Sequence, residues 1–340
     1  MNAISIDRSR WQEQGVSENY AMMADRLALA YEHMGAKPTF TCAPYQLPDP
    51  PVFGEHIAWA ESNAVAYANS VIGSRTNRYG DFIDICAALT GRVPLSGYHL
   101  NKERLGTILI KLPDLRKIDS TFYPVLGYLV GSYVGSGVPV IDGLPDSPSS
   151  DDLKAFGAAA ATAGAVGMFH MVGITPEAPT IEAAFGDNDP PEEWEITRDE
   201  LIDVWKKLST AHFQKVDQVL MGSPHFSLDE CYKLSELVSG KYCDPRIEFL
   251  ITTNDFVYER AKNKGLVAEI EKFGARFNTN ICLCMLNNSI ISKSKHTLMT
   301  NSGKFAHYGP GLLDRGIYFG SMENCVQTAI DGKLSITMPL

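Results

Sequence analysis

The stretch VDQVLMGSPHFSLDECYKLSELVSGKYCDPRIEFLITTNDFVYERAK (216–262) decides the fold of this chain. It predicts, in order, a strand, a turn, a helix, a second strand and a second helix, with the strands at 216–221 and 247–252. Ser227 and Glu230 have the spacing of a capping box, in which each side chain satisfies a backbone N–H at the helix start. Strands and helices that alternate with short links predict an α/β fold with a parallel sheet.

Polar segments follow three of the predicted strands at or near their carboxyl ends. These segments are GSPH (222–225), TTN (252–254) and NTNIC (278–282), the last on a strand predicted at 276–285. In open parallel sheets, ligands bind beyond the carboxyl ends of the strands. We therefore expect the three segments to meet at one shared cleft.

The rest of the chain gives further elements and one candidate boundary. Helices are predicted at 10–35, 55–72, 81–90, 121–135 and 153–163, and strands at 106–112 and 165–174. His170 lies inside the last of these strands, and we expect a buried core histidine there. The Ser-, Pro- and Asp-rich loop at 145–152 is the best internal boundary on composition, so we divide the chain into regions 1–145 and 146–340.

Composition excludes several classes of protein. The chain has 340 residues, 45% of them hydrophobic and 21% charged, as in soluble globular proteins. Its formal net charge of −10 argues against nucleic-acid and membrane-surface partners, which favour a basic face. No apolar run reaches the length of a membrane span, and the first residues lack the apolar core of a signal peptide. We expect a cytoplasmic protein.

Seven scattered cysteines form no disulfide framework and no CxxC pair. Cys42, Cys282 and Cys325 each fall at a predicted strand end or helix start, where backbone N–H groups can stabilise a thiolate. Three such thiolates could hold an iron–sulfur cluster, although unpaired cysteines more often pack as small buried hydrophobes. Cys284 alternates with Cys282 on the predicted strand, so we expect it to face the other way.

Two further stretches carry the residue types of a ligand site. TNSGKFAHYGPGLLDRGIYFGSMENC (300–325) collects an amide, a hydroxyl, an amine, an imidazole, a phenol and a thiol between glycines. GSRTNRYG (73–80) is a turn with two arginines, whose guanidinium groups suit a carboxylate or a phosphate. In the helix predicted at 55–72, Glu61, Ser62 and Asn69 face either solvent or a polar cavity, and the sequence leaves both open.

Six stretches together resemble the large subunit of aconitase X. They are TCAPY (41–45), FGEHIAWAESNAVAYANSVIGSRTNR (53–78), GSPHFSLDE (222–230), NTNIC (278–282), TNSGKFAHYGP (300–310) and FGSMENCV (319–326). The resemblance implies an aconitase-like fold of three-layer α/β/α domains with mainly parallel sheets. It also implies a hydro-lyase that dehydrates a small hydroxy acid, either cis-3-hydroxy-L-proline or mevalonate 5-phosphate. The chain looks closer to the bacterial hydroxyproline branch.

The resemblance also implies a cofactor and a partner. An iron–sulfur cluster would be held by Cys42, Cys282 and Cys325, with [2Fe–2S] favoured over [4Fe–4S]. A small swivelling-domain subunit would complete a heterodimer and supply a catalytic serine.

The motifs that match also imply roles for individual residues. The expected catalytic residues are Lys304, His307 and Ser302. The expected substrate-binding residues are Glu61, Ser62, Asn69, Arg75, Thr76, Asn77, Arg78, His225, Asn301 and Tyr308.

Two departures from the family pattern bear on these expectations. Family large subunits usually begin with a further N-terminal segment that carries a histidine motif, and we expect region 1–145 to lack it. Ser223 stands where many relatives have cysteine, so we do not count this position as a ligand. A non-catalytic or degenerate binding subunit is the alternative of another class.

Overall fold

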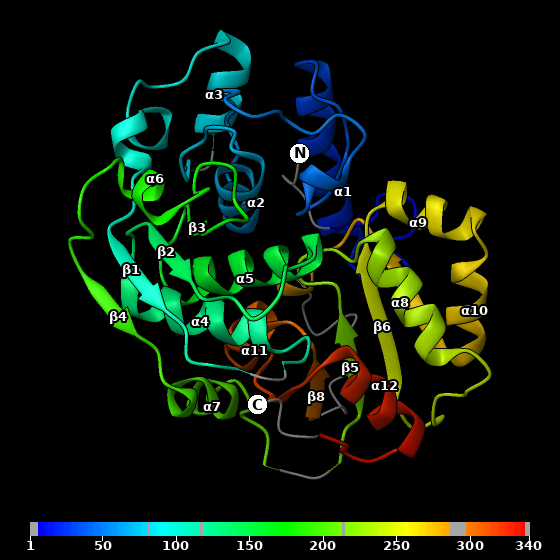
Figure 1. Ribbon diagram of the computed structural model, residues 1–340. Helices are drawn as coiled ribbons and strands as arrows, with labels where there is room; N and C mark the ends of the chain where they lie inside the picture. Colours follow the sequence, from blue (N-terminus) through cyan, green and yellow to red (C-terminus); the bar gives the residue numbers. More distant parts are fainter. Residues whose placement is uncertain (1–5, 81, 116–117, 213–214, 286–296, 337–340) are drawn as a thin grey trace. The chain divides into compact units, whose positions relative to one another are not determined.

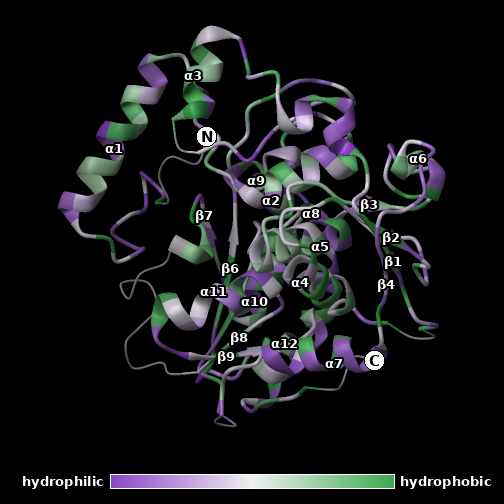
Figure 2. Ribbon diagram, turned by 90° about the vertical axis from the view of Figure 1, so that its left-hand side faces the viewer, coloured by the Kyte–Doolittle hydropathy of each residue, from purple (hydrophilic) through white to green (hydrophobic). Residues whose placement is uncertain are grey.

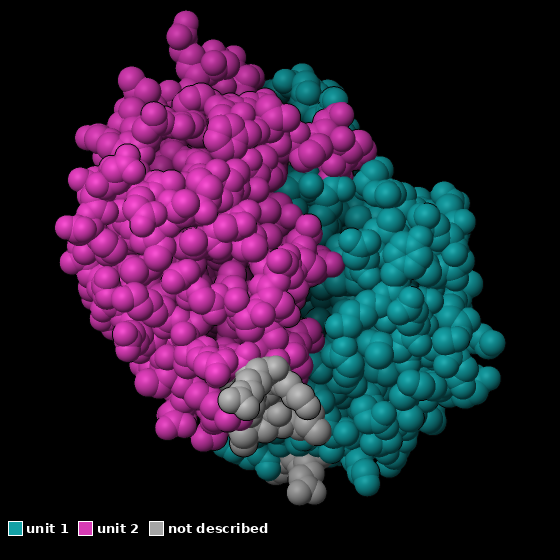
Figure 3. Space-filling model, in the orientation of Figure 1, with its two compact units in different colours: residues 1–46, 207–338 teal, residues 47–206, 339–340 magenta. Residues whose placement is uncertain are grey.

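The computed structural model describes residues 6–80, 82–115, 118–212, 215–285 and 297–336. The chain divides into two compact units (Figure 1, Figure 3). The first unit comprises residues 1–46 and 207–338, and the second comprises residues 47–206 with 339–340. Among the described residues, no helix combines the length and the apolar character that a membrane crossing needs.

The first unit contains a five-stranded sheet in which every neighbouring pair is parallel. Its strands are β5 (Gln218–Met221), β6 (Glu248–Thr253), β7 (Ala275–Thr279), β8 (Thr297–Thr300) and β9 (Gly316–Phe319). They run in the order β7-β6-β5-β8-β9. This sheet confirms the α/β fold with parallel strands predicted from 216–262.

Helices follow these strands and bury an apolar core against them. They are α8 (Leu228–Val238), α9 (Asp255–Asn263), α10 (Leu266–Phe273), α11 (Gly303–Leu313) and α12 (Met322–Asp331). Ser227 and Glu230 form the predicted capping box at the start of α8. The Asn254 side chain caps α9 by accepting a hydrogen bond from the backbone N–H of Val257 at 2.9 Å. Four of these helices, α8, α9, α11 and α12, begin within seven residues of a strand end, whereas α10 follows α9.

Helix α1 (Glu18–His33) belongs to the first unit and confirms the helix predicted near the N-terminus. Its buried face is made of Ala21, Ala24 and Ala28, whereas its large apolar side chains, including Met23 at 52% exposure, face outwards. Hydrophilic and hydrophobic residues alternate along it (Figure 2). The apolar spacing thus predicted the helix correctly.

The second unit contains a four-stranded parallel sheet in the order β3-β2-β1-β4. The strands are β1 (Ile108–Lys111), β2 (Pro139–Asp142), β3 (His170–Met171) and β4 (Glu193–Glu195). The helices are α2 (Ser62–Tyr67), α3 (Ile83–Thr90), α4 (Phe122–Val134), α5 (Ser150–Ala163), α6 (Ile181–Phe185) and α7 (Arg198–Lys207), the last of which reaches the first unit.

Helices α4 and α5 pack closely in this unit because two glycines face the neighbouring backbone. A Cβ at Gly127 would overlap the carbonyl oxygen of Phe156, and one at Gly131 would overlap that of Ala160. Both strands predicted at 106–112 and 165–174 exist, although the second is reduced to His170 and Met171.

The division of the chain differs from the boundary expected at 145/146. The loop at 145–152 joins β2 to α5 inside the second unit, where β2 lies between β1 and β3. The composition of this loop is that of an ordinary strand-to-helix connection ending in the Ser149–Asp152 capping box. Composition alone could not reveal that the first unit is discontinuous, because residues 1–46 join it through tertiary contacts. One such contact is the hydrogen bond from Thr279 Oγ1 to Asp7 Oδ2 at 2.7 Å.

His170 confirms the expected buried histidine. Its side chain is 2% exposed, and its Nε2 donates to the carbonyl oxygen of Arg104 at 2.8 Å. Its Nδ1 has no hydrogen-bond partner among the described residues. Burial lowers the pKa of this imidazole, because a charge there would be poorly solvated.

This burial predicts that the protein loses stability as the pH falls. The unfolded imidazole takes a proton near pH 6.5, whereas the folded one does so only at a lower pH. Below about pH 6.5 the unfolded state therefore binds more protons, and the free energy of unfolding falls until the folded pKa is reached. Thermal melts between pH 7.5 and 5.5 should show a smaller decline for His170→Gln, which keeps the donor to Arg104. An equal decline in the two proteins would contradict this origin.

Candidate functional site

The carboxyl edge of the first unit's sheet gathers the three segments expected there. Thr252 Oγ1 donates to the carbonyl oxygen of Gly222 at 2.8 Å, and Thr253 Oγ1 donates to that of Phe226 at 2.8 Å. These bonds tie the end of β6 to the loop after β5. The backbone N–H of Asn280 donates to the carbonyl oxygen of Thr253 at 2.9 Å, so the third segment lies at the same edge. The predicted convergence of the three segments at one edge is therefore confirmed within this unit.

The loop after β5 needs a glycine at its first position. Gly222 has a φ of +99°, and a Cβ there would overlap the carbonyl oxygen of Thr252. The next peptide bond, Ser223–Pro224, is cis. This turn brings His225 back over the strand ends.

His225 links three parts of the site and is 1% exposed. Its Nδ1 lies 3.3 Å from Thr41 Oγ1, and its Nε2 lies 2.9 Å from the carbonyl oxygen of Ile281. Because the carbonyl can only accept, Nε2 is the N–H donor of that pair. Asn254 Nδ2 donates to the Thr41 hydroxyl oxygen at 3.2 Å. Thr41 thus joins the chain's N-terminal part to the strand ends, a role that sequence reasoning missed although its motif was singled out.

Three thiols lie on this network. The backbone N–H of His225 points to Cys42 Sγ at 3.2 Å. Cys282 accepts hydrogen bonds from the thiols of Cys284 and Cys42, which, with the charge of Lys304, hold its pKa well below the usual range of a thiol. The Cys284 pKa is raised, first because it donates to Cys282 and then by burial. Cys282 therefore has more thiolate character than Cys284.

The expected orientation of Cys284 is wrong. Strand β7 ends at Thr279, and Leu283–Met285 form a 3-10 turn, so the alternation of a strand does not apply. Asn280, with a φ of +61°, starts this change of direction. Cys284 Sγ consequently lies on the same side as Cys282, 3.7 Å from Ser223 Oγ. Cys42 likewise lies in an irregular segment rather than at a strand end.

Cys325 has a different environment. It lies in the first turns of α12, as predicted, but its thiol is fully buried in the apolar core with Met299, Met322 and Val326. Burial raises its pKa. Within the described residues, no group of three or more His, Cys, Asp or Glu side chains is arranged to hold a metal ion. Cys42 and Cys282 fit a thiolate-bound cluster, whereas the described geometry does not bring Cys325 to them.

The residues predicted on α11 have contrasting environments. Ser302 caps the helix by accepting from the backbone N–H of Phe305 at 3.0 Å, and its hydroxyl donates to the carbonyl oxygen of Ser223. Lys304 is 7% exposed, and its positive charge acts on the thiols of Cys282 and Cys284. His307 is exposed by its accessible surface. Partial desolvation of its imidazole, followed by the charge of Lys207, lowers its pKa. Of the three predicted catalytic residues, Lys304 is the one whose charge acts on the thiols of Cys282 and Cys284.

Two other predicted residues of the first unit, Asn301 and Tyr308, are more open. Asn301 is half-buried at the carboxyl end of β8, and Tyr308 is 39% exposed with its ring edge-on to His307.

The remaining predicted residues lie in the second unit. Asn69 and Thr76 are fully buried, and their polar atoms bond within the unit. Glu61 Oε1 accepts from Asn63 Nδ2 at 2.8 Å beside the half-buried Ser62 at the start of α2. Asn69 therefore faces neither solvent nor a cavity, the two alternatives that its sequence left open.

The arginine turn has one engaged and one unengaged guanidinium group. Arg75 donates to the carbonyl oxygen of His99 at 3.0 Å and to Asn101 Oδ1 at 2.6 Å. Asn77 Nδ2 donates to the carbonyl oxygen of Ser96 at 3.1 Å. Arg78 is exposed and makes no hydrogen bond or ion pair to the part of the chain that the structure describes.

Histidine and tyrosine side chains, which the sequence did not single out, surround this turn. His99 Nδ1 lies 2.8 Å from His56 Nδ1, and its Nε2 lies 2.5 Å from the Tyr79 hydroxyl. Burial and the neighbouring His56 lower the pKa of His99. No motif spacing could have revealed this pair, since His99 comes from a separate 3-10 turn.

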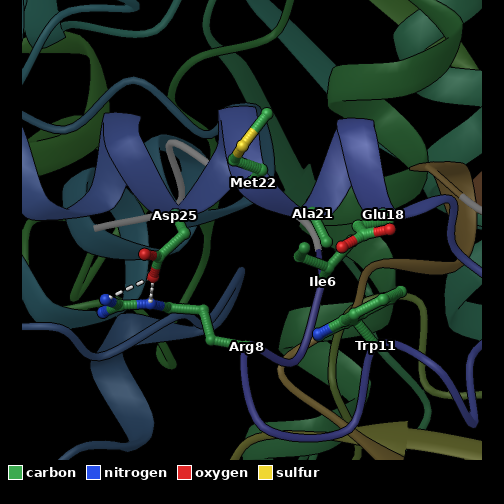
Figure 4. A pocket seen from close by; sticks show the side chains of 7 residues that line it. All are labelled: Ile6, Arg8, Trp11, Glu18, Ala21, Met22 and Asp25. Carbon is green, nitrogen blue, oxygen red and sulfur yellow. Dashed lines mark hydrogen bonds and ion pairs between the residues drawn. The ribbon is translucent and has the colours of Figure 1, made fainter.

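A pocket of about 300 Å³ lies between α1 and the segment before it (Figure 4). Its lining residues are Ile6, Arg8, Trp11, Glu18, Ala21, Met22 and Asp25. Arg8 is ion-paired with Asp25 and Glu32. None of the predicted site residues lines this pocket, so we do not assign the chemistry to it.

Comparisons with known proteins cover nearly the whole chain. Models for the first, second and third domains of aconitase X match residues 1–102, 106–206 and 216–331. The chain is 46% identical over 340 residues to a cis-3-hydroxy-L-proline dehydratase of Pseudomonas aeruginosa, covering all of this chain and 59% of that protein. It is 34% identical over 332 residues to the phosphomevalonate dehydratase large subunit of Methanocaldococcus jannaschii, covering 96% of this chain and 80% of that protein.

A solved structure is also similar. The holo-form crystal structure of aconitase X from Thermococcus kodakaraensis matches with a TM-score of 0.83 and 30% identity, covering 92% of this chain and 78% of that chain. This match agrees with the aconitase-like fold expected from the sequence.

The thiol geometry predicts which cysteine substitution abolishes metal binding. We expect Cys282→Ser to lose the visible absorbance and iron of the anaerobically purified protein, because it removes the thiolate at the centre of the thiol network. Cys86→Ser, at an exposed cysteine of the second unit, is the matched control and should keep both. Retention of iron and colour by Cys282→Ser would show that Cys282 is not a ligand.

Proposed function

The chain belongs to the aconitase X family, and on that premise we propose that it dehydrates cis-3-hydroxy-L-proline to Δ1-pyrroline-2-carboxylate. One observation carries this substrate: 46% identity to cis-3-hydroxy-L-proline dehydratases, against 34% to a phosphomevalonate dehydratase. The chain spans 59% and 58% of the lengths of the two hydroxyproline relatives. We propose that the activity belongs to an assembly with a small swivelling-domain subunit that supplies a catalytic serine, as the description of the M. jannaschii relative as a large subunit suggests.

The reaction removes a proton from Cα and hydroxide from the neighbouring carbon, which together leave as water. The resulting enamine then tautomerises to the cyclic imine. This chemistry needs a base, help for the leaving hydroxide and a partner for the substrate carboxylate. We assign the carboxylate to Arg78, with Arg75, Thr76 and Asn77 forming its turn.

The proton transfers are assigned to residues of the first unit. Lys304 is a buried amine whose charge acts on the thiol network, so it is our first candidate for moving a proton. His307 and Ser302 complete the proposed catalytic set, with Ser302 orienting α11 through its cap. Asn301, Tyr308 and His225 are proposed to orient the substrate, as are Glu61 and Ser62 in the second unit. Asn69 is expected to act only through the backbone of Thr76, because its own amide is satisfied within the unit.

We further propose an iron–sulfur cluster bound by Cys42, Cys282 and Cys325. When bound, it would supply a Lewis acid for the leaving hydroxide. The Cys42–Cys282 contact supports two of these ligands, and resemblance alone supports Cys325 and the preference for [2Fe–2S] over [4Fe–4S]. A cytoplasmic location is proposed from composition.

Iron analysis of a matched pair of variants tests the third ligand. Cys325→Ser should lose the bound iron, and Cys284→Ser should retain it. The reverse result would assign the third thiol to Cys284, which already contacts Cys282.

The substrate is tested with the chain purified anaerobically together with an aconitase X small subunit. Formation of pyrroline carboxylate from cis-3-hydroxy-L-proline is expected. Turnover of mevalonate 5-phosphate instead would establish the second candidate, favoured by the M. jannaschii relative. An iron-free protein that turns over neither would favour the non-catalytic alternative.

Arg78 gives a test of carboxylate binding in the same assembly. We expect Arg78→Ala to raise KM for cis-3-hydroxy-L-proline at least tenfold, because a charge-assisted hydrogen bond contributes about 1.5–3 kcal/mol. Arg92→Ala, at another exposed arginine of the second unit, should leave KM unchanged. Equal KM values for Arg78→Ala and the wild type would remove Arg78 from the binding site.

A further inference from the structure

The side-chain amide of Asn69 holds the turn at 73–80, which carries Arg75 and Arg78, through hydrogen bonds to its backbone. Its Oδ1 accepts from the backbone N–H of Thr76 at 2.9 Å and from Arg104 Nη1 at 3.3 Å. Its Nδ2 donates to the carbonyl oxygens of Thr76 at 2.8 Å and Gly167 at 2.9 Å. Asn69 is therefore saturated with hydrogen bonds, and it holds both backbone polar groups of Thr76.

Arg104 determines which way this amide points. A guanidinium group has only donors, so it requires the oxygen of the Asn69 amide and would be opposed by its NH₂ group. Arg104 Nη2 also donates to the backbone carbonyl of Asn69 at 2.9 Å, and Nη1 to that of Tyr98 at 3.1 Å. Its Nε lies 2.9 and 3.0 Å from the two carboxylate oxygens of Glu177. Glu177 thus orients Arg104, and Arg104 orients Asn69.

The turn held in this way carries the arginine that the substrate would meet. Thr76 is immobilised by Asn69, and Asn77 Oδ1 accepts from the backbone N–H of Tyr98 at 2.9 Å. Arg78 follows directly and is exposed, without a hydrogen bond or ion pair to any described residue. The chain is fixed up to the residue before Arg78, and the guanidinium group of Arg78 is left for a ligand.

We infer that Arg104 is a positioning residue for substrate binding, acting through Asn69 and Thr76 on the placement of Arg78. This inference rests on the proposed function, in which Arg78 binds the substrate carboxylate. Burying a guanidinium group is a costly way to stabilise a fold, because the charge loses its hydration, and the partner carboxylate of Glu177 stays 22% exposed. Arg104 is 2% exposed, and three of its hydrogen bonds reach Asn69 and Tyr98, which hold the turn. A preorganised guanidinium group binds more tightly because its ordering precedes binding.

Two variants separate this role from simple stability. The double variant Arg104→Met/Glu177→Gln removes both charges together and leaves no unpaired buried ion. Asn69→Asp keeps the acceptor for Arg104 but loses the two N–H donors to Thr76 and Gly167. Arg92→Met is the control at an exposed arginine of the same unit.

Each protein is assembled with the small subunit and measured in two ways. Amide hydrogen exchange is followed in peptides covering residues 74–79, with peptides from β5 and β6 as an internal control. KM and kcat are measured with cis-3-hydroxy-L-proline. We expect exchange at 74–79 to become at least tenfold faster with β5 and β6 unchanged. In both variants KM should rise at least tenfold while kcat stays within about threefold of the wild type. The conservative variant Arg104→Lys should show a smaller rise in KM than the double variant.

Two results would overturn the inference. Unchanged exchange at 74–79 in the folded variants would show that Arg104 does not hold the turn. Faster exchange with an unchanged KM would show that its role is structural only. A wild-type assembly without dehydratase activity is a different failure, since it contradicts the proposed function while the exchange data still decide whether Arg104 holds the turn.

Discussion

Five parallel strands of the first unit end at one edge, and the arrangement of the thiols depends on that constraint. Parallel pairing sends every strand's last backbone groups, and the loop that follows, to the same side of the sheet. Segments far apart in the sequence then share one small volume, where His225 bonds to both Thr41 and Ile281. Cys42 and Cys282 lie close together because both flank His225, which the loop after β5 places at this edge.

The parallel sheet and its helices were predictable because their signals are local. Hydrophobic runs, the capping box at Ser227 and the cap at Asn254 each specify an element within a few residues. The convergence of polar segments at the strand ends followed from topology alone. The resemblance to aconitase X added the fold family, which the comparisons confirm.

Other features could not be predicted because they depend on tertiary contacts or on single backbone angles. The orientation of Cys284 differs from the predicted one because the strand ends at Thr279 and Asn280 adopts a positive φ. Arg104 belongs to no recognisable motif, and it lies 35 residues from Asn69 in the sequence.

The insertion of the second unit between residues 46 and 207 has a consequence for biosynthesis. A ribosome releases residues 1–46 first, but the sheet that they join is made only after the whole insert has emerged. The second unit is continuous over residues 47–206, so its parallel sheet can form before residues 1–46 have their partners from 207 onwards. The contact between Cys42 and the backbone of His225 closes a loop of 183 residues. Cys42 consequently reaches His225 and Cys282 only after translation has passed both, so the thiol network assembles late in the synthesis of these two units.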